Sequence, residues 1–185
     1  QVAKYVARSI FTETDEQQED LIPTLSPDSA GRRGDMPELH RFANADDELR
    51  YIAERINQLI KQGLSPDNIA VLYRYEHQAQ SVEKALAEDD IAFVSTRNEK
   101  DKLHLYGDES RVKIVSMYSS KGLEFDVVFI AHLNQMPKKN ADLQAEARLL
   151  YVAMTRAIET LVFTYHESSE FTEQVQQAIA QAERN

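Results

Sequence analysis

The sequence contains no cysteine among its 185 residues. Disulfide frameworks, thiol chemistry and cysteine-based zinc sites are therefore excluded, and the absence agrees with a reducing, cytoplasmic setting. A chain of this length buries about 70% of the surface that its unfolded form exposes, so it needs no covalent or metal cross-link to hold a core. With 42% hydrophobic and 28% charged residues, the composition indicates one globular domain over residues 1–185.

Long apolar runs and an excess of positive charge are also absent. The longest uninterrupted apolar run, 149–154, has six residues, far short of the roughly 20 that a membrane-spanning helix needs. The formal net charge is −10, which argues against nucleic-acid binding over the whole surface because each phosphate contact uses a Lys or Arg. The chain begins at Gln1 with a helix-like pattern over 2–11 and no basic-then-apolar leader, so we expect it to be part of a longer protein.

Apolar patterns predict alternating strands and helices after an acidic, proline-containing surface connection over 12–36. The predicted strands are 37–43, 69–73, 91–94, 112–117, 127–131 and 160–164, and the predicted helices are 49–60, 76–87, 142–158 and 168–184. This order predicts an α/β domain with a mainly parallel sheet and helices on both faces. Ligands of such sheets bind at the carboxyl ends of the strands, which selects Arg74, the segment 118–124 and the helix 142–158.

The segment 116–126 leaves one strand, turns through hydroxyl groups, Lys121 and Gly122, and enters the next strand. Small residues beside a cation can receive phosphate oxygens through their backbone N–H groups. A tight polar connection, in which Gly122 only permits the turn, explains the same residues equally well. No Gly-x-x-x-x-Gly-Lys-Ser/Thr motif occurs, so the chain cannot wrap a triphosphate by itself.

The helix predicted over 142–158 carries an apolar stripe of Ala147, Leu150, Met154 and Ala157, beside Arg148, Tyr151, Thr155 and Arg156. An arginine in this position is either a solvated helix residue or, if it projects toward a neighbouring domain, a source of positive charge for a phosphoryl group in transfer.

Two stretches resemble known motifs. The sequence Ser-x-Lys-Gly-Leu-Glu-Phe at 119–125, an apolar strand after it, and Tyr-Val-x-x-Thr-Arg-Ala at 151–157 resemble motifs V and VI of UvrD/Rep-like superfamily 1 DNA helicases. Residues 69–74 with 78–81 resemble their motif IV, and the resemblance covers about 69–166. It implies a RecA-like, P-loop NTPase-type domain that lacks the P-loop itself. Such a domain closes over ATP and Mg²⁺ held by an upstream RecA-like domain of the same chain.

The resemblance also implies roles for single residues. Arg156 would contact the γ-phosphate and Arg74 would assist it as a second catalytic, nucleotide-binding arginine. Glu124 would lie near the nucleotide ribose, and Gly122 would lie in the same nucleotide-binding loop. The residues implied at an edge that faces single-stranded DNA are Tyr118, Ser119, Ser120 and Lys121. The implied activity is that of an ATP-dependent DNA helicase or translocase, of 3′-to-5′ polarity, with DNA repair as its setting.

The sequence departs from the family pattern at two places. Tyr118 stands where many relatives have His, and a Tyr can still stack on a base or hydrogen-bond a phosphate. Only 95–111 separates two predicted strands where larger relatives carry a long accessory domain, so we expect no large insertion there. The compact form is similar to the smaller members of the family, some of which act on RNA polymerase instead of unwinding DNA. We therefore expect ATP hydrolysis before strand separation.

Other functions stay open from the sequence. A non-catalytic module on the same fold, binding RNA polymerase or a repair factor, is the alternative from another class; a free-standing nucleotide-binding domain is disfavoured by the missing phosphate loop. The five histidines show no metal-ligand spacing, and the sequence predicts no metal site. They are His40, His77, His104, His132 and His166.

Overall fold

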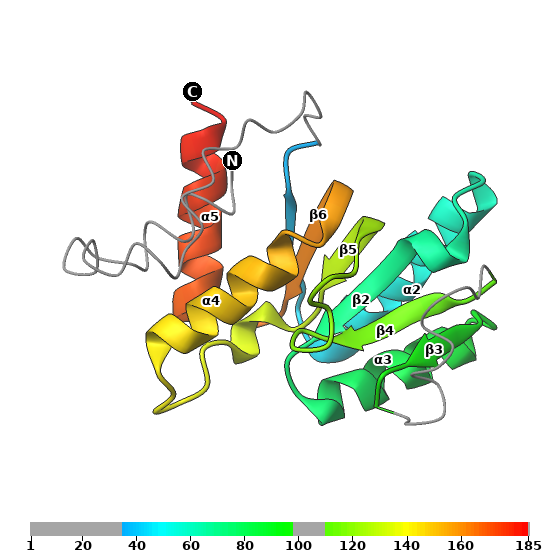
Figure 1. Cartoon of the computed structure of the whole chain (residues 1–185), viewed down its shortest axis with the longest axis horizontal. Helices are drawn as coiled ribbons and strands as arrows, with labels where there is room; N and C mark the ends of the chain where they lie inside the picture. Colours follow the sequence, from blue (N-terminus) through cyan, green and yellow to red (C-terminus); the bar gives the residue numbers. More distant parts are fainter. Residues whose placement is uncertain (1–34, 98–109, 185) are drawn as a thin grey trace.

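The computed structural model describes residues 35–97 and 110–184. The helix predicted over 2–11, nearly all of the connection predicted over 12–36, and most of the segment 95–111 lie outside the described residues. Within them, one six-stranded sheet has the order β1-β6-β5-β2-β4-β3, and every neighbouring pair is parallel (Figure 1). The predicted fold class is confirmed.

The elements alternate along the chain as the pattern predicts. The strands are β1 (Glu38–Arg41), β2 (Ile69–Tyr73), β3 (Phe93–Ser95), β4 (Val112–Ser116), β5 (Phe125–Ile130) and β6 (Ala157–Tyr165). The helices are α2 (Ala45–Lys61), α3 (Glu76–Glu88), α4 (Leu143–Met154) and α5 (Glu170–Ala182), with the short 3₁₀ helices η2 (Pro66–Asn68) and η4 (Leu133–Gln135). None of the helices in the described ranges is long and apolar enough to cross a membrane.

Helices cover both faces of the sheet, and β2 at its centre shows how. Ile69, Val71 and Tyr73 face a core that includes α2 and α3. Ala70 and Leu72 face the opposite core, which α4 and α5 complete. A strand that alternates between two cores must be apolar throughout, and all five residues of β2 are buried.

Helix α2 begins and ends where its sequence signals lie. The Asn44 side chain caps its first turn by accepting a hydrogen bond from the Asp47 backbone N–H at 2.9 Å. Gly63, at a φ of +99°, turns the chain after the helix in a conformation that side chains disfavour. Between these ends, Ile52, Ala53 and Ile56 are buried.

The boundary between α4 and β6 corrects the prediction of a helix through residue 158. The helix ends at Met154, and β6 already begins at Ala157, opposite Phe125 of β5. The Phe125 backbone N–H donates to the Arg156 carbonyl oxygen at 3.0 Å. Pairing with β5 therefore converts the last predicted turn of the helix into strand, and Arg156 lies in the turn between the two elements. A smaller shift places β3 over Phe93–Ser95 instead of 91–94.

A buried carboxylate joins α2 to the ends of β5 and β6. Glu48 lies in the first turn of α2 and is fully buried. Its Oε1 accepts hydrogen bonds from the His132 backbone N–H at 2.7 Å and the Thr164 hydroxyl at 2.6 Å. Its Oε2 lies 3.0 Å from Nδ1 of His132 and 2.6 Å from Nδ1 of His166.

We call Glu48, His132, Thr164 and His166 the carboxylate clamp. Glu48 and the two histidines offer ligand atoms within 4.8 Å of one another, a grouping that the spacing of the histidines did not predict. Each carboxylate oxygen already has two hydrogen-bonding partners, so the buried charge is satisfied within the chain. Burial raises the pKa of Glu48, but the hydrogen bonds and charge of His132, with the bonds from His166 and Thr164, outweigh it and lower the pKa to about 2.

The clamp predicts a specific loss of stability in acid. A pKa lowered from 4.5 to about 2 means that Glu48 contributes about 3 kcal/mol above pH 4.5, and this contribution is lost as the pH falls toward 2. We expect Glu48→Gln to lower the free energy of unfolding by about that amount at neutral pH and to flatten its dependence between pH 5 and pH 2. Urea unfolding across this range measures both. Glu54→Gln, on the exposed face of the same helix, is the control, and equal pH dependence in the two variants would contradict the prediction.

Candidate functional site

Arg74 follows β2 directly, and its guanidinium is held by a carboxylate on α4. Its Nη2 donates to Oε1 of Glu146 at 2.7 Å, and its Nε lies 3.2 Å from both carboxylate oxygens. The side chain of Arg74 is 15% exposed and that of Glu146 is 5% exposed. The hydrogen bond to Glu146 is the largest cause of a raised pKa of Arg74, so this arginine stays charged.

Two aromatic rings flank the same guanidinium. Its Cζ lies 5.0 Å from the ring centroid of Tyr118 and 4.8 Å from that of Tyr75, which is within the range of cation–π attraction. The Tyr75 ring stacks in turn on His77, at 5.7 Å between centroids. Tyr118 is 63% exposed, so the carboxyl ends of β2 and β4 present an aromatic surface that rests on a fixed cation.

The loop between β4 and β5 folds on itself before crossing to the next strand. The Ser119 backbone N–H donates to Oγ of Ser116 at 3.1 Å, and the two hydroxyls lie 2.9 Å apart. Gly122 has a φ of +85°, so the turn requires a residue that tolerates the left-handed region. Lys121 is exposed at the tip of this turn.

Ser120 departs from the expected DNA-facing position. It is fully buried, and its hydroxyl donates to the Met117 carbonyl oxygen at 2.7 Å. This hydroxyl is engaged in closing the loop, so it is not presented for DNA contact. The other three residues expected to face DNA, Tyr118, Ser119 and Lys121, are exposed.

Arg156 sits against the far end of the same loop. Its Nη1 donates to the Leu123 carbonyl oxygen at 3.0 Å, its Nε to the Val152 carbonyl oxygen at 3.0 Å, and its Nη2 to the Thr155 hydroxyl at 3.0 Å. These bonds fix the guanidinium beside Gly122 and Glu124, the two neighbours of Leu123 in the chain. Glu124 is exposed.

The structure therefore divides the predicted residues into two groups. Arg74 and Tyr118 meet at the carboxyl ends of β2 and β4, whereas Arg156 adjoins Gly122 and Glu124 at the start of β5. Helix α4 separates them: its axis advances about 1.5 Å per residue, so Glu146 and Met154 lie about 12 Å apart along it. Arg74 and Arg156 are not brought together by contacts between described residues.

Two residues that shape the first group carry no distinct signal in the sequence. Glu146, the partner of Arg74, is 72 positions away in the chain, a separation that local pattern cannot span. Buried Gln78 accepts the backbone N–H groups of Arg74 and Tyr75 at 2.8 and 2.9 Å through one side-chain oxygen. Its position four residues after Arg74, in the segment that resembles motif IV, is the one clue that the sequence offers.

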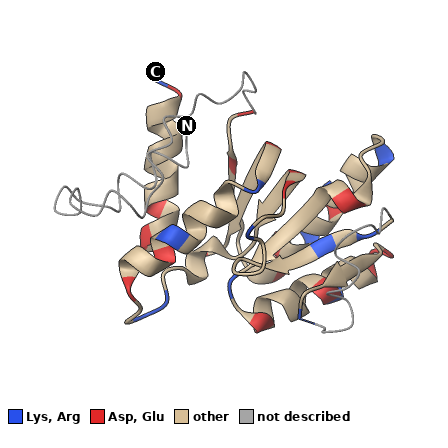
Figure 2. Ribbon diagram, viewed as in Figure 1, with Lys and Arg blue, Asp and Glu red and all other residues tan. Residues whose placement is uncertain are grey.

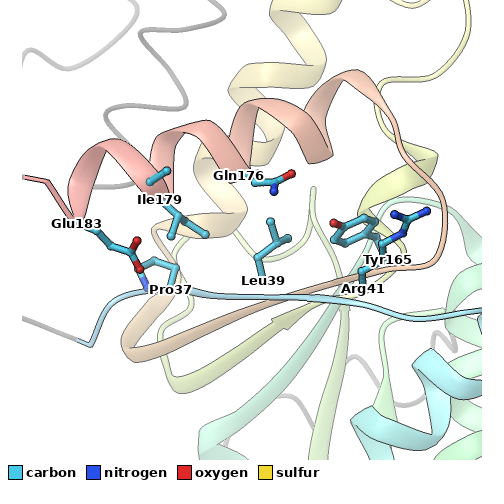
Figure 3. A pocket seen from close by; sticks show the side chains of 8 residues that line it. Pro37, Leu39, Arg41, Tyr165, Gln176, Ile179 and Glu183 are labelled. Atoms are coloured by element: carbon cyan, nitrogen blue, oxygen red, sulfur yellow. The ribbon is translucent and has the colours of Figure 1, made fainter.

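Neither the distribution of charge over the described elements nor the hollow beside α5 singles out the predicted site residues. Figure 2 shows basic and acidic residues interspersed over the described elements, without a continuous basic band. A hollow of about 390 Å³ lies between β1 and α5 (Figure 3). Its walls are Pro37, Leu39, Arg41, Tyr165, Gln176, Ile179, Ala180 and Glu183. None of these is a predicted site residue, so this hollow is separate from both groups.

One parallel sheet covered by helices on both faces is the fold of this chain. Solved structures share it. The C-terminal domain of a possible DNA helicase from Lactobacillus plantarum WCFS1 aligns with a TM-score of 0.67 and 19% identity, covering 97% of this chain and 93% of that one. The C-terminal domain of the DEAD-box protein Dbp5 aligns with a TM-score of 0.53 and 12% identity, covering 79% of this chain and 83% of that one.

The family model of the UvrD-like helicase C-terminal domain matches residues 2–100 and 94–168, and the chain belongs to this family. ATP-dependent DNA helicase Rep of Buchnera aphidicola (from Schizaphis graminum) is 44% identical over 63 residues, 31% of this chain and 10% of that protein. The helicase srs2 of Schizosaccharomyces pombe is 31% identical over 119 residues, 62% of this chain and 12% of that protein. PcrA of Staphylococcus aureus is 31% identical over 105 residues, which are 51% of this chain and 14% of that protein. The chain thus spans about a tenth of these relatives.

The environment of Arg74 predicts that its loss is costly. Arg74→Ala leaves the buried Glu146 carboxylate without its cation, and breaking a buried pair in this way destabilises proteins by about 3–5 kcal/mol. Chemical unfolding of the purified chain measures the change. Arg50→Ala, which removes the exposed partner of Asp47, is the matched control and is expected to cost less than about 1 kcal/mol. Equal effects of the two variants would contradict the assignment of a buried pair.

Proposed function

We propose that this chain is the C-terminal motor half of an ATP-dependent DNA helicase or translocase. It completes, from the side opposite the Walker motifs, an ATP site that an upstream RecA-like domain of the same protein supplies with the phosphate loop and the Mg²⁺ ligands. The position of Arg156 carries the proposal. An arginine at the end of a covering helix, fixed beside the loop of Gly122 and Glu124, can project charge toward a nucleotide held by a second domain.

The hydrogen bonds of Arg156 fit this role. A guanidinium has five N–H donors, and described residues take three of them, one each from Nε, Nη1 and Nη2. One N–H on each terminal nitrogen is left for oxygens of a phosphoryl group. Fixing the guanidinium in advance favours the transition state, because no reorganisation is needed when charge grows on the γ-phosphate.

We assign single-stranded DNA to the carboxyl ends of β2 and β4. The exposed ring of Tyr118 offers a face on which a base can stack, and Ser119 and Lys121 lie beside it for the phosphate backbone. Arg74 supports this surface from beneath. Its expected role at the γ-phosphate stays a prediction, but its engagement by Glu146 and two tyrosines supports a place on the DNA side.

The polarity, 3′-to-5′, rests on the family resemblance, as does a role in DNA repair. A non-catalytic module that binds RNA polymerase or a repair protein is the alternative. The absence of DNA-stimulated ATP hydrolysis by the full-length protein would favour it.

The purified 185-residue chain is expected to hydrolyse no ATP above background. Its groups reach one side of a nucleotide, and it has no phosphate loop of its own. Steady-state turnover at saturating ATP and Mg²⁺ decides this. Robust hydrolysis that disappears in Arg156→Ala would show that the chain holds a complete site.

In the full-length protein, Arg156→Ala is expected to lower DNA-stimulated kcat by about 10³–10⁵-fold, because an arginine finger acts on transition-state charge. ATP affinity should change much less. Arg156→Lys should recover little, since an ammonium cannot reproduce the forked donors that reach Leu123, Val152 and a phosphate together. Thermal melting of both variants controls for folding. A lysine variant with nearly normal turnover would reduce Arg156 to a structural helix-end charge.

A further inference from the structure

The pair formed by Arg74 and Glu146 joins the two groups of the proposed site, and its place in the fold suggests more than stability. Glu146 belongs to the first turn of α4, the helix that leads directly to Arg156. Arg74 belongs to the end of β2 and lies under Tyr118. We propose that Glu146 is a positioning residue through which α4 couples DNA contact at Tyr118 to the nucleotide contact at Arg156. This inference rests on the proposed function.

The contacts form a closed ring. Tyr118 leads along its loop to Leu123, whose carbonyl oxygen accepts from Arg156 at 3.0 Å. Arg156 follows α4, whose first turn carries Glu146, and Glu146 holds Arg74 at 2.7 Å. Arg74 returns to Tyr118 across 5.0 Å. Packed side chains and ion pairs of this kind are the physical carriers of coupling between sites.

Each segment of the ring resists being moved alone. Helix α4 is capped by Asp142, which accepts backbone N–H groups of its first turn, and Ala147, Leu150 and Ala153 are buried beneath it. The link from Arg74 to Glu146 is charge-assisted and directional, because Nε and Nη2 both meet one carboxylate. A base that stacks on Tyr118 and shifts its ring therefore acts on Arg74, then on Glu146 and the helix.

Coupling between two binding sites is reciprocal, so it can be measured from either side. If the ring transmits it, nucleotide binding changes the affinity for single-stranded DNA by a factor, typically about 5–150-fold in allosteric proteins. Replacing Glu146 should abolish the change in DNA affinity that nucleotide binding causes. Replacing a residue that only contacts DNA should lower the DNA affinity with and without nucleotide by the same factor. The two roles are thereby separated by one ratio of dissociation constants.

The test uses the full-length protein and a fluorescent single-stranded oligonucleotide. Dissociation constants are measured by anisotropy with and without a non-hydrolysable ATP analogue plus Mg²⁺. We expect the ratio of the two constants to differ from one in the wild type and to move close to one in Glu146→Gln. Lys121→Ala leaves the backbone between Tyr118 and Leu123 in place and removes an exposed cation whose side chain forms none of the contacts that close the ring. It should weaken binding in both states and keep the wild-type ratio.

The outcomes separate the inference from the proposed function. A wild-type ratio in Glu146→Gln, or a ratio of one in the wild type, overturns the coupling role while leaving DNA binding in place. Failure of the wild type to bind the oligonucleotide overturns the proposed function itself.

The single variant leaves Arg74 without its carboxylate and can fail to fold. The double variant Arg74→Gln with Glu146→Gln buries no unpaired charge, keeps hydrogen-bonding groups on both sides, and should show the same loss of the ratio. Its thermal melting confirms that the fold is intact. A double variant that melts normally and keeps the wild-type ratio overturns the inference.

Discussion

The parallel direction of the six strands within residues 35–97 and 110–184 is the constraint on which the rest of the structure depends. A parallel pair cannot be joined by a tight turn, so the chain must cross back over the sheet between one strand and the next. Helices make most of these crossings and bury both faces. Because the strands share one direction, their carboxyl ends collect at one edge, and there Arg74, Tyr118 and the carboxylate clamp appear. The direction of the strands thus determines where these polar side chains gather, whatever function each of them has.

Two buried carboxylates position the helices on opposite faces of this sheet. Glu48 in the first turn of α2 reaches the ends of β5 and β6, and Glu146 in the first turn of α4 reaches the end of β2. Removing a carboxylate from water is costly unless its oxygens are satisfied. Four partners satisfy Glu48, and a forked guanidinium satisfies Glu146. Each carboxylate thus ties the first turn of its helix to the carboxyl ends of particular strands.

The sequence was sufficient to predict elements whose pattern is local. The continuous apolar run of β2 predicts a strand that is buried on both faces, and the apolar stripe and cap of α2 predict a helix with one buried face. The motifs around Gly122 and Arg156 indicate the family. The sequence was insufficient where contact with a residue far away in the chain determines the local structure. The end of α4 depends on β5, since Ala157 pairs with Phe125. Ser120 was expected at the surface because nothing in the neighbouring residues reveals that its hydroxyl closes the loop. Glu48 and Glu146 read as ordinary first-turn acids, which favour helix starts in any protein.

Arg74 and Arg156 have different neighbours, and this difference supports the different roles proposed for them. Both are partly buried arginines in segments that resemble helicase motifs. Arg74 faces a carboxylate that neutralises it, so the charge it offers to a phosphate is reduced, and the planar group serves as a platform for tyrosine rings. Arg156 donates hydrogen bonds to two carbonyl oxygens and a hydroxyl. None of these partners carries charge, so the full positive charge of Arg156 remains to act on an anion. On this reasoning the guanidinium with neutral partners is the one suited to a γ-phosphate. The guanidinium with an acidic partner is suited to hold another residue in place.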